Sequence, residues 1–397
     1  MLKIDRKNTA RIFSVITHSA KQLTAQVLGL LLSVFVIHYY SQELWGGFVS
    51  KLLYVSVTLL VLRWGSKDYL LREFAKTPAR IPQLFYIAFS TRLVLLLLSL
   101  CLTFLLFPSS QSGYLAIWIV AGYLAQSLEV FWMYHRDFLL AIGLEILAFL
   151  WLLMVLDYAG QLTTQILLEW YTWYQAFRAA LYVGLYRTAL KRPHFVIDWR
   201  FFATTSSFFL LSLSGFLQSR ADFVVIALYE KPEQIGIYQV LNTYFILIHA
   251  MGHFILLPFL KNIYRLQLAA VDKIQRQLVW VAPFVVTASL TGLYLLLRLA
   301  YHITLDWWFY VIGFFITFPP YLYAVKILRL YRDNRQHLVF WVGLRAIAIS
   351  SGLAFVLLRM GFGLKGALLA SAVSQIYTAY QYLNIDSLEK QGHPIQS

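Results

Sequence analysis

Polar stretches divide this chain into about twelve apolar runs, each close to the ~20 residues that a helix needs to cross a bilayer. The connections between the runs are short, and only the links at 65–80, 188–200 and 259–277 leave room for a short interfacial helix. No stretch is long enough for a soluble domain, so we predict an all-α, polytopic membrane protein. Its spans are expected at 10–38, 47–64, 81–107, 114–134, 138–156, 165–187, 201–228, 236–258, 278–298, 306–327, 338–358 and 365–385.

Several of these spans carry polar residues at i+3 and i+4 spacing, which places them on one helix face. Such stripes indicate either hydrogen bonds between helices or a water-filled cavity, and for the small hydroxyls the first reading is favoured. A histidine pair in the eighth span could relay protons or simply bond a neighbour. The stripes include His18, Gln22 and Gln26; Arg92, Ser99 and Thr103; Ser207, Ser214, Gln218 and Asp222; Asn242, His249 and His253; Ser371, Gln375 and Thr378.

Composition and charge fix the class and the orientation. The chain is 60% hydrophobic and 13% charged, which excludes an ordinary soluble domain. Its net charge of +15 comes from Lys and Arg that fall almost entirely in alternate loops. By the positive-inside rule this places both termini in the cytoplasm, where anionic lipids rather than nucleic acid receive the charge. The external loops hold only Lys231, Arg298, Arg359 and Lys365.

Six cations lie inside the apolar runs instead of in loops: Lys21, Lys51, Arg92, Arg178, Arg220 and Arg345. A charge at the bilayer centre costs ~2.5–3.5 kcal/mol on insertion scales, so each needs a reason. Only four acids share the membrane with them: Glu129, Glu145, Glu169 and Asp222. We therefore predict a water-filled cavity with a cationic lining. Lys51 could instead snorkel to the external interface, and Arg178 could lie in the cytoplasmic leaflet.

Two of the intramembrane acids, Asp222 and Glu129, are the candidates for proton or cation coupling, because a buried carboxylate can exchange a proton at physiological pH. Structural pairing with a cation is the alternative. The single cysteine excludes an intrachain disulfide and a Cys-based metal site. No catalytic set, phosphate-binding loop or metal-spaced cluster is present, so we expect neither an enzyme nor a bound metal or cofactor.

The chain also shows an internal repeat. With a shift of 190 residues, Glu43 aligns with Glu233, Gly46 with Gly236, Phe48 with Tyr238 and Tyr54 with Tyr244. The aligned turn opens the second helix of each half. We therefore predict two six-helix bundles, at 1–192 and 193–397, related by an axis along the membrane normal, as in many secondary transporters.

Local motifs resemble those of the polysaccharide and O-antigen (Wzx-type) flippases of the multidrug/oligosaccharidyl-lipid/polysaccharide (MOP) exporter superfamily, whose fold is also that of the MATE transporters. Trp45-Gly46-Gly47-Phe48 is followed by Trp64-Gly65 and by Leu71-Arg72-Glu73-Phe74. In the second half, Ser219-Arg220-Ala221-Asp222 leads to Gly236-Ile237-Tyr238. Of the candidate site residues, only Arg220 and Asp222 fall inside a matching motif.

The resemblance implies a multi-pass protein of the bacterial inner membrane that carries undecaprenyl-diphosphate-linked oligosaccharide to the periplasmic leaflet. The implied mechanism is alternating access through a cationic central cavity, driven by a proton or sodium gradient. Besides this glycan and membrane lipids, we expect polysaccharide polymerase machinery as a partner and a monomeric protein. The alternatives are a drug/cation antiporter of the same superfamily, for which the cavity has the wrong charge, and a membrane polymerase or ligase of lipid-linked glycans, which needs a large external loop.

Overall fold

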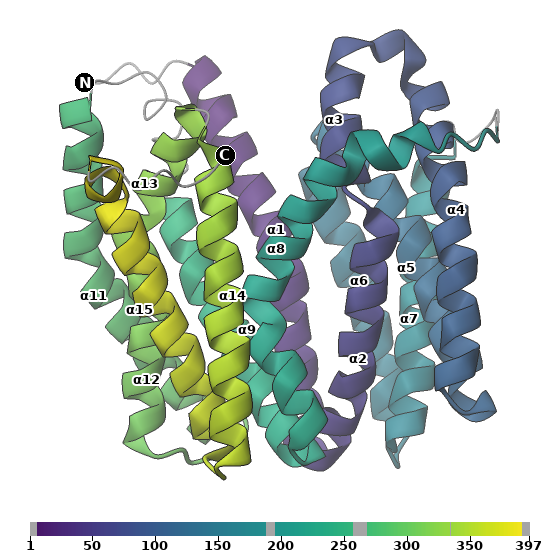
Figure 1. Cartoon of the computed structure of the whole chain (residues 1–397). Helices are drawn as coiled ribbons and strands as arrows, with labels where there is room; N and C mark the ends of the chain where they lie inside the picture. Colours follow the sequence, from purple (N-terminus) through teal and green to yellow (C-terminus); the bar gives the residue numbers. More distant parts are fainter. Residues whose placement is uncertain (1–5, 188–194, 257–267, 334, 391–397) are drawn as a thin grey trace. The chain divides into compact units, whose positions relative to one another are not determined.

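The computed structural model describes residues 6–187, 195–256, 268–333 and 335–390, and every regular element in these ranges is helical (Figure 1). The first half contains α1 (Arg6–Tyr39), α2 (Gln42–Arg63), α3 (Ser66–Lys76), η1 (Pro78–Arg80), α4 (Ile81–Leu106), α5 (Ser109–His135), α6 (Phe138–Tyr158) and α7 (Thr164–Leu185). The second contains α8 (Arg200–Tyr229), α9 (Pro232–Leu256), α11 (Leu268–Leu299), α12 (Trp307–Thr317), α13 (Pro319–Arg332), α14 (Gln336–Arg359) and α15 (Gly363–Lys390).

Eleven of the predicted spans correspond to one long helix each in the described residues, the tenth corresponds to the pair α12 and α13, and the predicted polytopic all-α fold is confirmed. Ten helices in the described ranges are long and apolar enough to cross a membrane. The other two long helices, α7 and α15, carry more polar residues, among them Glu169, Arg178, Ser371 and Gln375. Their polarity fits helices that face other helices or water rather than lipid.

The three longer links differ in structure, and in the described residues only the first forms a short helix of the kind for which the sequence leaves room. The 65–80 link contains the short amphipathic helix α3 and the one-turn helix η1. Residues 268–277 extend the ninth span as the start of α11, and the earlier part of that link lies outside the described residues. Residues 195–198 instead form a non-helical strap along α4: Ser90 Oγ donates to Val196 O at 2.6 Å, and Asp198 N donates to Thr91 Oγ1 at 3.0 Å.

The chain forms two compact units, which we call unit 1 (residues 1–32 and 44–213) and unit 2 (residues 33–43 and 214–397). The helices α1 and α8 each contribute residues to both. The predicted boundary at 192/193 falls in residues 188–194, outside the described part of the chain. An aromatic core that includes Phe74, Phe85 and Phe131 fills unit 1, and Tyr323 and Tyr382 anchor a smaller cluster in unit 2.

The tenth predicted span is broken at Phe318, where α12 ends and α13 begins with two prolines. Pro320 cannot donate to the carbonyl of Ile316, four residues earlier. His249 of α9 lies 3.1 Å from that oxygen and satisfies it. Gln275 of α11 donates to Tyr321 O and Leu322 O at 2.9 and 2.8 Å. The break is therefore held by side chains of two neighbouring helices, and His249 has a structural bonding partner.

The aligned turn of the internal repeat has the same place in both halves. Gly46 is the fifth residue of α2 and Gly236 the fifth residue of α9. Two residues later, Phe48 and Tyr238 are both almost fully buried, at 0% and 1% exposure. The aligned aromatic positions are therefore core positions in each half.

A second pair of aligned residues contacts the next helix in each half. Tyr54 of α2 shares a 2.9 Å hydrogen bond with Thr103 of α4. Tyr244 of α9 lies so close to Gly292 of α11 that an added Cβ there would be 2.9 Å from its hydroxyl. Gly292 is one residue short of the position that the 190-residue shift assigns to Thr103. The second and third spans of the two halves thus meet at nearly the same register.

Candidate functional site

In unit 1, two intramembrane cations share one carboxylate. Lys21 Nζ of α1 lies 2.8 Å from Glu145 Oε1 of α6, and an Arg178 terminal nitrogen of α7 lies 3.3 Å from the same oxygen. Tyr182 donates its hydroxyl to Glu145 at 3.2 Å, and Lys21 also lies 5.1 Å from the ring centre of Trp132. Lys21 and Glu145 are buried, so the cluster carries a net positive charge inside the helix bundle.

The Arg178 guanidinium retains an unused donor. Its NH1 group donates to Gln175 Oε1 at 3.0 Å, while its buried Nε has no hydrogen-bond partner among the described residues. A buried donor without a partner is costly, which favours a site where water or an anionic group completes the shell. The Arg178 side chain is 25% exposed although its Nε is buried, so an anionic group can approach its terminal nitrogens.

Arg92 of α4 is held without any carboxylate in the described part of the chain. Its guanidinium donates to Leu62 O and Ser127 Oγ, both at 3.2 Å, its Nε donates to Ala88 O, and Tyr123 lies under it at 5.3 Å. Leu62 is the last residue but one of α2, so the cation also meets the negative end of that helix dipole. These neutral groups satisfy the donors of Arg92 but leave its charge uncompensated.

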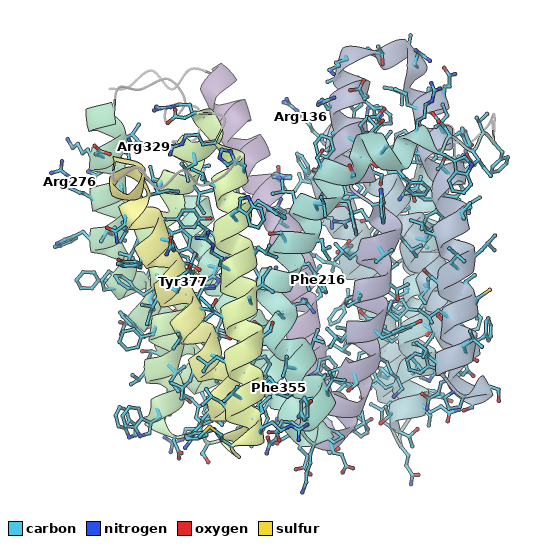
Figure 2. All side chains as sticks on the ribbon, in the orientation of Figure 1. Arg136, Phe216, Arg276, Arg329, Phe355 and Tyr377 are labelled. Carbon is cyan, nitrogen blue, oxygen red and sulfur yellow. The ribbon has the colours of Figure 1, made fainter. Side chains whose placement is uncertain are left out.

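The remaining three cations have fewer contacts. Lys51 is half-buried and donates to Gly47 O, four residues earlier on its own helix, at 3.2 Å. Arg220 of α8 is half-buried against the ring of Phe216, which Figure 2 labels, at 5.6 Å. Arg345 is exposed near the middle of α14. None of the three has an ion pair among the described residues.

The two candidate coupling acids have different surroundings. Glu129 of α5 binds Arg63 at 3.1 Å and Lys67 at 3.2 Å, which ties α5 to the α2–α3 elbow. Asp222 of α8 is buried and accepts hydrogen bonds from the hydroxyls of Tyr238 in α9 and Ser371 in α15. Glu129 therefore has the pairing that a structural carboxylate needs, whereas Asp222 has neutral donors only.

Asp222 lines a polar cavity of about 270 Å³ within unit 2. Side chains from the predicted stripes of the seventh, eighth and twelfth spans converge there: Gln218, Asn242, His249, Ser371 and Gln375. Two of them are already bonded, since Asn242 donates to Ser219 O at 3.2 Å and Gln375 accepts from Tyr323 at 3.0 Å. The cavity thus offers carboxylate, amide and hydroxyl oxygens. Such oxygens coordinate hard cations such as sodium, and the carboxylate can also accept a proton.

Sequence reasoning did not identify the partners of these groups. Glu145 stood out as an intramembrane acid, but nothing in the sequence joins it to Lys21, 124 residues away. The aromatic faces of Trp132 and Tyr123 and the hydroxyl of Ser127 gave no signal at all, because aromatic and small polar residues are common in membrane helices. Tyr238 was visible only as a member of the repeated turn.

Comparisons with known proteins agree with this fold. No protein-family model matches the chain, and no curated protein matches it. Among solved structures, the chain is similar to the lipid II flippase MurJ in an inward closed conformation, with a TM-score of 0.68. The similarity covers 94% of this chain and 87% of that one at 13% sequence identity. At this identity the shared property is the fold, that of a multi-pass all-α membrane protein.

Proposed function

We propose that this protein translocates undecaprenyl-diphosphate-linked oligosaccharide repeat units across the bacterial inner membrane, for O-antigen, capsule or a related polysaccharide. The observation that carries the proposal is the excess of intramembrane cations. Of the six, only Lys21 and Arg178 contact a carboxylate in the described part of the chain, and it is the same one. The similarity in fold to a lipid II flippase supports a lipid-linked cargo.

A diphosphate suits these cations chemically. Guanidinium groups form charge-assisted, often bidentate, hydrogen bonds with phosphate oxygens, and low dielectric strengthens each contact. Arg178 in unit 1 and Arg220 and Arg345 in unit 2 are exposed enough to meet a diphosphate and its sugars, and Lys51 lies near the external end. The buried Lys21 and Arg92 add positive charge within unit 1. The lipid tail stays in the bilayer, and alternating access moves the headgroup. No bond is made or broken, so the protein acts as a transporter, which hands its cargo to the polymerase machinery.

We assign the coupling of transport to a proton or sodium gradient to Asp222 rather than to Glu129. A proton or sodium ion bound at Asp222 neutralises a buried carboxylate that has no ion pair among the described residues, and Tyr238 and Ser371 can reorient their hydroxyls when it binds. At Glu129 two cations already occupy the carboxylate oxygens. The other superfamily function, export of cationic drugs, would require excess acid where this chain has excess base.

Deletion of the gene in its host tests the proposal. We expect surface polysaccharide to be lost and single lipid-linked units to accumulate on the cytoplasmic face, detected by their resistance to an external glycosidase. Plasmid-borne wild-type protein should restore export. Accumulation of single units on the periplasmic face would instead indicate a polymerase, and normal surface polysaccharide would refute the proposal.

A further inference from the structure

An open apolar groove of about 490 Å³ lies between α11 and α12 in unit 2. Leu290 and Tyr294 line it from α11, and Tyr310, Val311, Phe314 and Phe315 line it from α12. Thr291 also faces it, but its hydroxyl donates to Thr287 O at 3.0 Å. The groove therefore suits a hydrocarbon chain.

One end of the groove is cationic. Arg298, in the last turn of α11, is exposed and donates to the Tyr294 hydroxyl at 2.7 Å, so its guanidinium is held at the groove mouth. No carboxylate pairs with Arg298 among the described residues. The neighbouring acid Asp306 binds Lys365 instead. A positive charge beside an apolar groove is complementary to a lipid with an anionic headgroup.

The depth of the groove matches one bilayer leaflet. Along α11 the lining from Thr287 to Tyr294 rises about 10 Å, and Arg298 lies one turn further, so the span from Thr287 to Arg298 is about 16 Å, roughly half of the hydrocarbon core. Trp307 and Trp308, exposed and stacked at 3.9 Å, begin α12 at the same end as Arg298. Tryptophan pairs of this kind mark the headgroup level. A chain in the groove would thus start at the interface and end near the bilayer centre.

We propose that the α11–α12 groove binds one acyl chain of an anionic phospholipid from the surrounding bilayer, with the lipid phosphate on Arg298. The charge distribution of the loops assigns this end to the external leaflet. The site is separate from the proposed path of the cargo and does not depend on the cargo's identity. A single guanidinium fits a phosphodiester with one negative charge, such as phosphatidylglycerol.

Native mass spectrometry of the full-length protein with added phosphatidylglycerol tests this site. Arg298→Gln should weaken the tightest lipid-binding event about tenfold, the value of one charge-assisted contact. Val311→Trp, which fills the groove, should remove that event while Arg298 is kept. The matched control is Arg359→Gln, which removes an external cation at the end of α14. The Arg359 guanidinium lies over the rings of Tyr229 and of Phe355, the second of which Figure 2 labels.

Three outcomes would overturn the proposal. Arg298→Gln could bind phosphatidylglycerol as the wild type does, or Arg359→Gln could lose it equally. In a competition arm, undecaprenyl phosphate could displace phosphatidylglycerol from the wild type at equal concentration, which would make the groove a site for the cargo lipid. Thermal midpoints of both groove variants within a few degrees of the wild type would confirm that the binding change is local.

Discussion

Glu145 is the carboxylate that two of the six intramembrane cations contact. Lys21, Arg178 and the Tyr182 hydroxyl all meet its carboxylate. Removing one of the two cations leaves the other ion pair in place. Removing the carboxylate leaves two cations in the bundle without a counter-charge, which is the more costly change. Loss of one cation and loss of the Glu145 carboxylate should therefore lower the stability of the protein by different amounts.

We predict that Glu145→Gln lowers the free energy of unfolding by about 3 kcal/mol. Lys21→Met should cost roughly 1 kcal/mol, since Arg178 and Tyr182 still satisfy Glu145. Thermal unfolding of the two purified variants in the same detergent measures the difference. Equal loss of stability in both would show that Glu145 is not the shared counter-ion.

At this scale the sequence locates the charged residues inside the apolar runs but not the groups they meet. A cation or acid inside an apolar run can be recognised from the sequence alone. Its partner depends on helix packing, which is why Glu145 and Lys21, or Arg92 and the end of α2, could not be joined beforehand. Arg220 and Asp222, two positions apart on α8, meet different groups: Arg220 lies over the Phe216 ring, and Asp222 accepts from Tyr238.

Among the elements, the elbow between α2 and α3 is the most tightly specified. Gly65 has a φ of +64°, and an added Cβ would lie 2.6 Å from Phe209 N and 2.7 Å from Phe208 Cβ. Beside it, Trp64 stacks on Phe209 at 4.1 Å and donates its indole N–H to Phe202 O. The Trp-Gly motif therefore packs the elbow onto the first half of α8.

We predict that Gly65→Ala lowers the free energy of unfolding by at least ~2 kcal/mol, because alanine is strained at this φ and collides with backbone. Gly143→Ala is the control: it lies inside α6 with nothing within 4 Å of the added Cβ, and alanine should stabilise that helix by up to ~1 kcal/mol. Thermal midpoints of both variants decide the matter. A Gly65→Ala protein as stable as the wild type would contradict the contact with α8.

Hydropathy located the helices because a helix that crosses the bilayer needs a long apolar stretch, and ten helices in the described ranges have one, whereas α7 and α15 are more polar. It did not locate the break in the tenth span, although Pro319 and Pro320 are plain in the sequence. A proline pair can kink, break or end a helix, and the outcome depends on whether neighbours satisfy the freed carbonyls. Here His249 satisfies Ile316 O, and Gln275 bonds Tyr321 O and Leu322 O at the start of α13, from helices that the sequence alone does not place beside α13.

For the whole molecule, the repeat and the charge distribution together predicted two halves of six helices each. Among the described residues, each half has five helices that are apolar enough to cross a membrane and one more polar long helix, α7 or α15, and the fold is shared with a lipid II flippase. The all-α polytopic fold follows from patterns along the chain, because the bilayer restricts the possible structures so strongly; the orientation and the two-bundle repeat stay predictions. The cargo has no such pattern, since a sugar is recognised by a few side chains from distant helices.

Arg345 offers the most direct test of the central claim, that unneutralised intramembrane cations carry an anionic lipid-linked glycan. It is exposed on α14, so its loss should leave the fold intact. In proteoliposomes loaded with fluorescent undecaprenyl-diphosphate oligosaccharide, Arg345→Gln should slow translocation about tenfold, and Arg345→Lys should restore most of it. Lys76→Gln, an exposed cation on α3, should have no effect. Translocation by Arg345→Gln at the wild-type rate would contradict the claim.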